Sequence, residues 1–441
     1  MTPLEILEKI QHHSEAYYVG GYVRDMLLKK ESEDIDIATR MTYGELKRLF
    51  SDCKMDEVGK RFQVLMIDGI EVATYRTDHY DINGNITGTR PTISLETDLD
   101  RRDLTINSIA YDPINDKLID TCNAQEDIKK RIIRFNGISY IRIIEDPIRM
   151  LRACRFLATI NRSRFALDTF KAIRANANLL KDIPKERIRL EIIKAMKAKN
   201  AGNFFRALHN TNLLQYVFPS MLETVGVDGG RYHNETVFEH CLMACDNIKT
   251  DNPLLKIAAF LHDVGKPMAN LLNSNGSFKG HDKIGSEMAS ENLKDLKFSN
   301  DEIHYITSII ELHMNNLTLE TTPKSIRKMR VKLENKNIDF DDFTHMVIAD
   351  HDANMKHEPH EPDMWFKLTQ LFLDSSTIES AFSVKDLAIG GNEVMTVLTM
   401  RSGPNVGRIL NKLFDMVVEN PELNKRETLL GILIDRNFEE K

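Results

Sequence analysis

Residues Tyr18–Thr39 read YVGGYVRDMLLKKESEDIDIAT, with Gly20-Gly21 ahead of two carboxylates, Asp34 and Asp36. Side chains two residues apart on a strand point to the same face, so both carboxylates would lie side by side. Mg²⁺ prefers one or two carboxylates plus substrate phosphates, and backbone N–H groups at a glycine turn can cradle a triphosphate. Together the two features predict a metal-dependent nucleotidyl transfer site, whereas each alone also occurs in ordinary surface turns.

Length and composition are those of an ordinary globular protein. The 441 residues allow about two to four domains. No apolar run approaches the ~20 residues of a membrane span, and the amino terminus lacks the features of a signal peptide, so we expect a cytoplasmic protein without a membrane partner. The five cysteines form no C-x-x-C pair, which argues against a disulfide framework or a zinc ribbon.

Charge is unevenly distributed along the chain. The net charge is −7, yet residues 101–200 contain 22 Lys and Arg against 12 Asp and Glu. A basic middle between acidic flanks is typical of a localised groove for a polyanion. A solvated helical face of mixed charge is the alternative interpretation.

A hairpin is predicted after the acids, with strands over 62–67 and 70–75 that turn at Asp68-Gly69. Glu71 interrupts the apolar pattern of the second strand. Burying a strand carboxylate is costly unless it is paired or metal-bound, so Glu71 is the third candidate acid of the site. The alternative is a simple edge-strand glutamate.

Two further segments follow the hairpin. Residues 77–92 are polar and rich in Gly and Asn, which predicts a mobile loop. Arg101 and Arg102 then precede Asp103. The guanidinium fork matches phosphate oxygens and a carboxylate accepts from a ribose hydroxyl, so this segment suits a nucleotide, with a surface ion-pair cluster as the alternative.

Four motifs resemble, in order and spacing, those of the class II tRNA nucleotidyltransferases, or CCA-adding enzymes, and of the related bacterial poly(A) polymerases. The motifs are Gly20-Gly21-x-Val23-Arg24-Asp25, Asp34-x-Asp36, Arg101-Arg102-Asp103-x-Thr105-x-Asn107 and Glu145-Asp146-x-x-Arg149. The resemblance covers about the first 200 residues closely. It departs at Asn123-Ala124, where the family usually carries glycine.

The resemblance and the helical periodicity beyond Asp127 imply an α+β fold, with a small mixed-sheet nucleotidyltransferase head followed by helical domains. The expected parts are a head over 1–135, a neck with the nucleotide-selecting motif over 136–200, a body with an HD-type metal site over 201–380, and a tail over 381–441. In the tail, Gly403-Pro404 is expected to open a helix that is a candidate for tRNA contact.

The resemblance also implies roles for individual residues. Asp34 and Asp36 would bind two Mg²⁺ ions, and Glu71 would complete the acid cluster. Asp146 and Arg149 would face the base, because a carboxylate accepts from the exocyclic amine of C or A, whereas U and G present the opposite pattern. The predicted nucleotide-binding residues are Gly20, Gly21, Arg24, Arg102, Asp103, Asn107, Asp146, Arg149, Arg152 and Arg155.

The base-facing motif is expected to open a helix at Glu145-Asp146-Pro147. Asp146 could instead be only the N-cap before a proline at the first helical position. The apolar stripe of this helix is Met150, Ala153, Cys154 and Leu157. A basic helix from Lys185 to Glu191 is expected to support the nucleotide site or to contact RNA phosphates.

A second constellation resembles an HD-type metal phosphohydrolase domain, and the segment LHDVGK at 261–266 is its most specific part. Imidazoles with carboxylates suit Mn, Fe, Ni or Zn better than Mg, and a metal so held makes a nucleophile of bound water. The candidate ligands are His240, His262, Asp263, His281, His313 and a distal aspartate at Asp350 or Asp352. Three nearby histidines are expected to lie in a solvated loop, namely His351, His357 and His360.

The sequence therefore predicts template-independent addition of C, C and A to the 3′ end of tRNA from CTP and ATP, with Mg²⁺ in the head. Hydrolysis at the HD site, with Ni, Mn or Fe, is a possible second activity. Within the class, the alternatives are a poly(A) polymerase or an enzyme that adds only CC or A. From another class, the alternative is an HD phosphohydrolase whose head only binds RNA.

Overall fold

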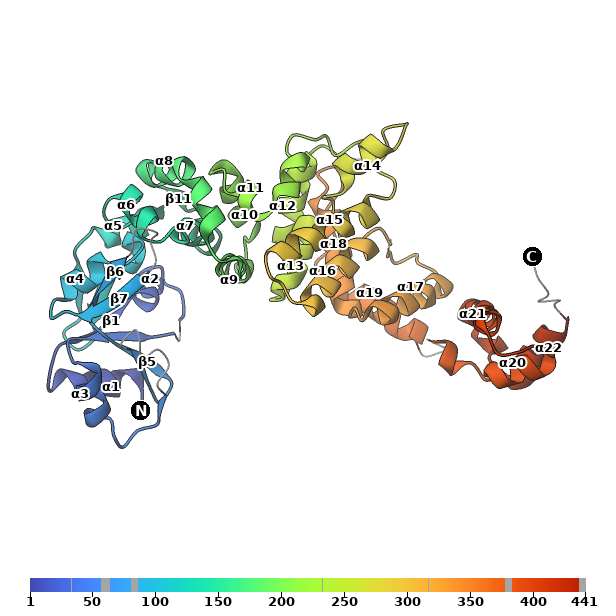
Figure 1. The fold of residues 1–441 in the computed structure, drawn as a ribbon, viewed down its shortest axis with the longest axis horizontal. Coiled ribbons are helices and arrows are strands. Elements are labelled where there is room, and N and C mark those ends of the chain that lie inside the picture. The colour runs from blue at the N-terminus through green and yellow to red at the C-terminus, as the bar shows by residue number, and fades with distance from the viewer. Residues whose placement is uncertain are drawn as a thin grey trace. The chain divides into compact units, whose positions relative to one another are not determined.

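The computed structural model describes residues 1–32, 34–56, 64–80, 86–231, 233–315, 317–376 and 383–435. The chain divides into two compact units, Met1–Leu222 and Glu223–Lys441 (Figure 1). Among the described residues, every named strand belongs to the first unit, and the second unit is helical. Within the same ranges, no helix combines the length and the apolar character needed to cross a membrane. The predicted α+β class is confirmed, and the ranges of the four predicted domains stay predictions.

A seven-stranded mixed sheet organises the first unit, in the order β3-β4-β5-β2-β1-β8-β9. Its strands are β1 (Ala16–Val19), β2 (Asp36–Thr39), β3 (Met55–Asp56), β4 (Val64–Ile67), β5 (Ile70–Thr74), β8 (Ile109–Asp112) and β9 (Lys117–Asp120). β2 and β5 run parallel, whereas the other neighbours are antiparallel. The parallel pairing therefore places the first residues of β2 and β5, which are distant in sequence, side by side at the same end of the two strands.

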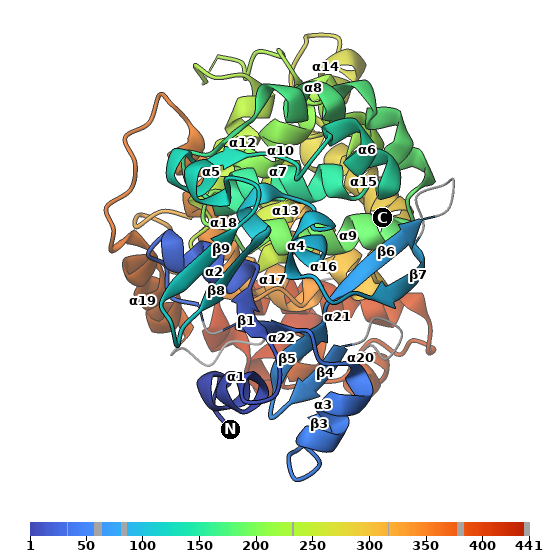
Figure 2. The same ribbon diagram turned by 90° about the vertical axis from the view of Figure 1, so that its left-hand side faces the viewer.

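Two smaller strand pairs accompany this sheet. β6 (Arg76–Tyr80) and β7 (Ile86–Pro91) form an antiparallel pair beside α4 (Leu95–Asp100) (Figure 2). β10 (Ile132–Ile133) pairs in parallel with β11 (Arg164–Phe165), which adds one short strand to the otherwise helical neck. The mobile loop predicted over 77–92 was wrong where the structure describes it, because β6 and β7 pair there, while residues 81–85 lie outside the described ranges.

The predicted hairpin is confirmed for β4 and β5, which pair in antiparallel register. Asp68 and Gly69 both have positive φ, of 48° and 87°, as expected for a tight two-residue hairpin turn. The predicted start at residue 62 lies outside the described ranges. The strand predicted from Asp34 was placed two residues too early, since β2 begins at Asp36.

Two helices of the first unit, α1 (Pro3–Gln11) and α3 (Tyr43–Leu49), begin with threonine capping boxes. Thr2 and Thr42 each form a capping box, with Glu5 and Glu45 respectively. The helices are α1 (Pro3–Gln11), α2 (Gly21–Leu27), α3 (Tyr43–Leu49), α4 (Leu95–Asp100), α5 (Ala124–Lys130), α6 (Ser139–Glu145), α7 (Arg149–Thr159), α8 (Leu167–Ala175), α9 (Lys185–Met196), α10 (Gly202–Asn210) and α11 (Leu214–Val217), with 3₁₀ turns at Thr105–Asn107, Ala177–Asp182 and Pro219–Thr224.

The departure from the family pattern at Asn123 has a structural explanation. Asn123 precedes α5 with φ +60° and ψ +34°, a left-handed conformation that asparagine adopts more readily than most residues. Asp120 accepts backbone bonds from Cys122 and Ala124 at 3.2 and 2.8 Å. Asparagine thus takes the backbone conformation that glycine would adopt freely, and the Asp120 bonds hold the turn.

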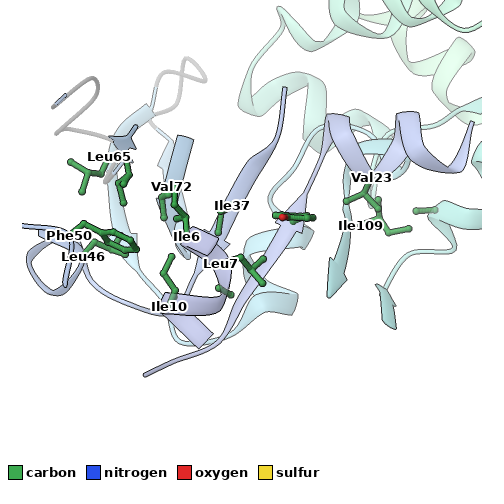
Figure 3. Close-up of a cluster of buried hydrophobic side chains, with 14 residues drawn as sticks. Ile6, Leu7, Ile10, Val23, Ile37, Leu46, Phe50, Leu65, Val72 and Ile109 are labelled. Atoms are coloured by element: carbon green, nitrogen blue, oxygen red, sulfur yellow. The ribbon is translucent and has the colours of Figure 1, made fainter. Parts of the chain in front are cut away.

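The main hydrophobic core lies between the sheet and helices α1 and α3 (Figure 3). On β2, Ile37 belongs to this core, whereas Ala38 belongs to a second cluster on the other face. Asp36 shares the face of Ala38 because side chains alternate along a strand. The sheet core therefore fixes which way Asp36 points.

The second unit consists of helices and 3₁₀ turns in its described part. These are α12 (Val237–Asn247), α13 (Pro253–Leu261), α14 (Lys266–Leu272), α15 (His281–Asp295), α16 (Asn300–Leu312), α17 (Pro323–Lys336), α18 (Phe340–Ala353), α19 (Met364–Ser376), α20 (Gly391–Val397), α21 (Pro404–Glu419) and α22 (Arg426–Asp435), with 3₁₀ turns at Val384–Asp386 and Pro421–Leu423. Buried Arg327 on α17 donates to the carbonyls of Val418 and Glu419 at the end of α21. The guanidinium thereby caps that helix terminus.

Replacing Ile37 by alanine should destabilise the sheet of the head by about 2–5 kcal/mol, because the side chain is fully buried and a cavity would remain. Hydrogen exchange of the β1, β2 and β5 amides measures this loss. Ile93, which is 71% exposed, is the matched control, and Ile93→Ala should change exchange by less than about 0.5 kcal/mol. Equal effects of both variants would contradict the packing described here.

Candidate functional site

Two carboxylates stand next to each other at the start of the parallel strand pair. Asp36 opens β2, and its register partner on β5 is Glu71. Glu71 was expected to be buried, and this was wrong, since the side chain is exposed. Strand register, rather than burial, therefore brings Glu71 beside Asp36. Asp34 is exposed and lies just before β2.

The environment of Asp36 disfavours a negative charge. Burial, followed by the nearby Glu71 and Asp34 carboxylates, raises the pKa of Asp36 to about 6, while Arg102 acts in the opposite direction. Carboxylate oxygens are the donors that hard divalent cations prefer. The three acids therefore fit a divalent metal, whose charge would relieve the repulsion.

A cavity of about 700 Å³ adjoins these acids within the first unit. Its walls come from the strand ends, the glycine turn, and the helices α7 and α9. The predicted site residues that line it are Gly20, Gly21, Arg24, Asp36, Glu71, Arg102, Asp103, Asn107, Asp146, Arg149, Arg152 and Arg155. A strip of carboxylates and a wall of arginines thus face one space of nucleotide size.

Gly20 lies close to the Arg102 side chain at the N-terminus of α2. Gly20 has φ +70°, and a Cβ atom built there would lie 3.0 Å from Arg102 Nη1. Arg102 Nε is buried and has no hydrogen-bond partner among the described residues. The glycine therefore leaves space for a guanidinium that retains an unused donor, which fits an anionic ligand.

Asp98 positions the Arg102 guanidinium, and it was not among the predicted site residues. Its carboxylate is buried and accepts from Arg101 Nη2 at 2.8 Å and from Arg102 Nη2 at 3.1 Å. It also accepts from the backbone N–H of Arg76 at 3.1 Å. The spacing of an acid three and four residues before two arginines, as on one face of a helix, was the available signal.

Asp103 connects the cavity wall to α7 through Arg152. Its Oδ2 accepts from Arg152 Nε at 2.6 Å, and its Oδ1 accepts from the Asn107 amide at 3.3 Å. Burial alone would raise the pKa of Asp103, but Arg152 and Asn107 hold it well below its usual range. Asn107 in turn accepts from Arg24 Nη1 at 2.6 Å, so these four predicted residues form one network.

The predicted base-facing pair, Asp146 and Arg149, lines the cavity, and the backbone N–H of Arg149 donates to the Asp146 carbonyl oxygen at 3.1 Å. Arg149 Nη1 donates to Glu145 at 2.6 Å, whereas Asp146 Oδ2 accepts from Arg187 Nη2 at 2.7 Å. The expected helix start at Glu145 was wrong. Glu145 ends α6 and α7 begins at Arg149, because Asp146 takes an extended conformation between the two helices.

Glu191 on α9 orders the remaining arginines. It is buried and accepts from Arg155 Nε at 2.7 Å, with Arg152 Nη1 3.9 Å away. The Arg155 guanidinium also lies 4.6 Å from the Phe156 ring centre. Glu191 was expected on a supporting helix, but its arginine partners could not be predicted, since helical spacing does not reveal contacts between helices.

The second unit brings all six predicted HD ligands together. They come from α12, α15, α18 and from the ends of α13 and α16, which carry His240, His281, Asp350, His262-Asp263 and His313 respectively. Three of the imidazoles have Nδ1 within hydrogen-bond distance of a backbone carbonyl oxygen, at 2.5–2.8 Å. His240 Nδ1 lies 3.1 Å from Glu235 Oε1. Their Nε2 atoms are therefore left to face the centre.

Distances within this cluster are short. His240 Nε2 and His262 Nε2 lie 2.8 and 3.3 Å from Asp350 Oδ1, and His281 Nε2 lies 3.1 Å from Asp263 Oδ1. Buried His262 Nε2 makes no well-directed hydrogen bond within the described ranges, although two carboxylate oxygens lie 3.3 Å away. Such a converging set of N and O donors fits a transition metal.

The structure distinguishes the two candidate distal aspartates. Asp350 contacts His240 and His262, whereas Asp352 contacts His351 and His360 outside this centre. Asp263 has neighbours of opposite charge. Burial would raise its pKa, but His262 and Lys266 hold it well below the usual range.

Three family models match successive segments of the chain. The poly A polymerase head domain matches residues 16–134, the probable RNA and SrmB-binding site of polymerase A matches residues 164–224, and the HD domain matches residues 231–336. The first match contains the acid cluster and its arginines, and the third contains five of the six HD-type residues. Asp350 lies beyond the third match.

Curated relatives include enzymes of several names. The CCA-adding enzyme of Staphylococcus aureus (strain MRSA252) is 29% identical over 96% of this chain and 95% of the relative. The A-adding tRNA nucleotidyltransferase of Deinococcus radiodurans is 29% identical over 73% and 74%. Poly(A) polymerase I of Salmonella typhi is 34% identical, but the chain spans about half its length, 52%.

Solved structures agree with these matches. The crystal structure of the Bacillus stearothermophilus CCA-adding enzyme in complex with CTP is 26% identical, covers 99% of this chain and 97% of its own, and has a TM-score of 0.71. The Thermotoga maritima CCA-adding enzyme complexed with tRNA shares the fold, at 17% identity over 98% and 92% with a TM-score of 0.56. The chain therefore contains matches to a poly A polymerase head domain, to the RNA-binding region of that polymerase and to an HD domain, and it is similar to CCA-adding enzymes over nearly its whole length.

Proposed function

We propose that this protein adds C, C and A to the 3′ end of tRNA from CTP and ATP, without a nucleic-acid template. The observation that carries the proposal is the single cavity in which Asp36 and Glu71 face a wall of arginines. Relatives named CCA-adding enzyme align over nearly the whole chain, which favours this reaction over poly(A) synthesis. The substrates agree with the expected cytoplasmic location.

Both domains imply dependence on divalent metals, and we assign Mg²⁺ to the head. Asp34 and Asp36 would hold it, and Glu71 would complete or orient the acid cluster. When bound, such ions lower the pKa of the attacking 3′-hydroxyl and neutralise charge on the triphosphate. Asp36, with its pKa near 6, loses its proton readily at neutral pH and so is ready to bind a cation.

The arginine network would seat the rest of the nucleotide. Arg102, whose Nε is unused, would bind phosphate, together with Arg24 and the backbone at Gly20 and Gly21. Asp103 would accept from the ribose hydroxyl. Carboxylates already position the guanidinium groups of these arginines, so the arginine side chains would lose little conformational entropy when the nucleotide binds.

Asp146 and Arg149 would choose the base. A carboxylate accepts from the exocyclic amine of C or A, and a guanidinium donates to the neighbouring ring nitrogen. The bound base would compete with Arg187 for Asp146 and with Glu145 for Arg149. A base that leaves one of these groups unpaired in the cavity loses about 1–3 kcal/mol, which disfavours U and G.

The HD centre supports a second proposed activity, metal-dependent hydrolysis of a phosphodiester. Four imidazoles and two carboxylates converge there, and this donor set suits Ni, Mn or Fe better than Mg. When bound, the metal would make a hydroxide of its water at neutral pH. The alternative of a hydrolase whose head only binds RNA is opposed by the presence of Asp34, Asp36, Asp103 and Arg149.

Product sequencing tests the main proposal. With tRNA lacking its 3′ end and Mg²⁺, wild type should add CC from CTP alone and CCA from CTP with ATP. Asp36→Ala should lower incorporation about 100-fold or more, because a metal ligand at the reacting phosphate is lost. Asp52→Ala, at a side chain 74% exposed, is the control. Long tails of A would instead identify a poly(A) polymerase, and full activity of Asp36→Ala would overturn the proposal.

The raised pKa of Asp36 also predicts a stability change. Its folded-state pKa lies above the ordinary 3.8, so the folded protein binds the proton more tightly than the unfolded chain does, and stability falls as pH rises from about 4 to about 6. Without metal at pH 7.5, Asp36→Asn should therefore stabilise the head by roughly 1–3 kcal/mol, and the gain should vanish below pH 4.

Hydrogen exchange of the β2 and β5 amides in EDTA measures this difference, and added Mg²⁺ should reduce it. Asp34→Asn, at an exposed carboxylate, is the matched control and should have the smaller effect. A gain for Asp36→Asn that persisted at pH 3.5 would show that removal of charge is not its cause.

For the HD centre, purified protein with Ni²⁺ or Mn²⁺ should release product from 2′,3′-cyclic nucleotides. His262→Ala should abolish this activity because a buried ligand is lost, while nucleotide addition by the head should remain. The control is His304→Ala, at an exposed histidine on α16. No turnover by wild type with either metal would leave this centre only a structural role.

A further inference from the structure

A second group of histidines surrounds Asp352, outside the HD centre. His351 and Asp352 lie in the last turn of α18, and His360 lies in the segment that follows this helix. Asp352 Oδ1 lies 3.2 Å from His351 Nδ1 and 2.8 Å from His360 Nδ1. The three side chains are half-buried and accessible from solvent, with 35%, 20% and 18% of the His351, Asp352 and His360 side chains exposed.

The expectation of a solvated histidine loop was wrong for His351, which lies on α18, whereas His360 lies in the segment after the helix, as expected, but is half-buried. Their rings pack with centroids 3.9 Å apart, and the exposed His357 stacks on His351 at 4.6 Å. Three imidazoles thus gather around one carboxylate. His357 is the nearest candidate for a further ligand beyond the two rings that face Asp352.

We propose that His351, Asp352 and His360 form a second metal site that takes a borderline divalent transition metal such as Zn²⁺. Their nitrogen and oxygen donors lie within 4.8 Å of one another. Tetrahedral zinc with bonds of about 2.0–2.1 Å needs donors roughly 3.4 Å apart, so small side-chain rotations suffice. Two imidazoles and one carboxylate leave a further position for His357 or water.

This site is separate from the HD centre, although both use α18. Residues two apart on a helix do not face each other, so Asp350 and Asp352 point in different directions. Asp350 contacts His240 and His262, and the closest contacts of Asp352 are with His351 and His360. The two groups of ligands therefore share a helix but no residue.

Metal at the second site would also brace a partner of the HD centre. The segment between Asp352 and His360 includes Met355, whose N–H donates to Glu235 Oε2 at 3.1 Å. Glu235 Oε1 lies 3.1 Å from His240 Nδ1. Fixing His360 to α18 would thus hold the segment that helps to orient Glu235, and through it His240.

A purely structural tie is the competing explanation, because Asp352 Oδ1 also accepts from the backbone N–H of His360 at 2.9 Å. Asp352→Asn separates the two. An asparagine oxygen still accepts these hydrogen bonds but is a much poorer ligand for zinc than a carboxylate. The hydrogen-bonded turn would therefore survive in this variant, whereas the metal site would not.

The test uses the full-length chain, stripped with EDTA and titrated with Zn²⁺ alone. Bound zinc is counted after equilibrium dialysis, and hydrogen exchange is followed over residues 353–360. Wild type should bind one more equivalent than Asp352→Asn and than the double variant His351→Gln/His360→Gln, and Zn²⁺ should protect this segment only in wild type. His345→Gln, on the same helix but outside the cluster, should match wild type.

The same count in a His262→Gln background removes the HD contribution, and the difference of one equivalent should persist there. If that background does not fold, exchange over 353–360 in the wild-type background decides, because it reports on this segment directly. Equal zinc counts in wild type and Asp352→Asn, or equal protection of the segment, would overturn the proposal and leave a hydrogen-bonded turn.

Discussion

The parallel pairing of β2 with β5 is the constraint on which the head depends. It sets Asp36 beside Glu71, and the two carboxylates repel each other. A bound cation or protonation of one carboxylate would relieve this repulsion. The core beneath them, with Ile37 fully buried, prevents the strand from turning its carboxylate away. The hydrophobic packing of the sheet thus keeps the Asp36 carboxylate directed toward the cavity.

Buried carboxylates perform the complementary task on the opposite wall. Asp98, Asp103 and Glu191 each bind arginines, and so position several positive charges around one cavity. Each acid is buried and would be costly alone, but in a network each charge is paired and directed. The site therefore combines a cluster of negatively charged carboxylates with a wall of positively charged arginines. The carboxylates would attract metal ions and the arginines would attract a triphosphate, so the site suits a triphosphate with bound metal ions.

The helical second unit also holds its functional side chains in fixed directions, but it does so mainly with backbone carbonyl groups. Its HD residues come from five helices or helix ends between residues 237 and 353, and three rings are oriented by backbone carbonyls at 2.5–2.8 Å. A carbonyl held in a helix cannot move far, so it fixes the ring tautomer and direction. Asp352, two residues from Asp350, gathers its own imidazoles on another side of the same helix.

The sequence by itself determined the glycine turn, the acids and the arginine motif, because these follow from local spacing and residue chemistry, and the HD histidines were identified by their resemblance to an HD-type domain. Only the tertiary structure decided which groups meet. Register made exposed Glu71 a neighbour of Asp36, helix packing joined Glu191 to Arg155, and an extended residue at Asp146 moved the start of α7. Such contacts join residues that are far apart in the chain, and periodicity along the sequence contains no information about them.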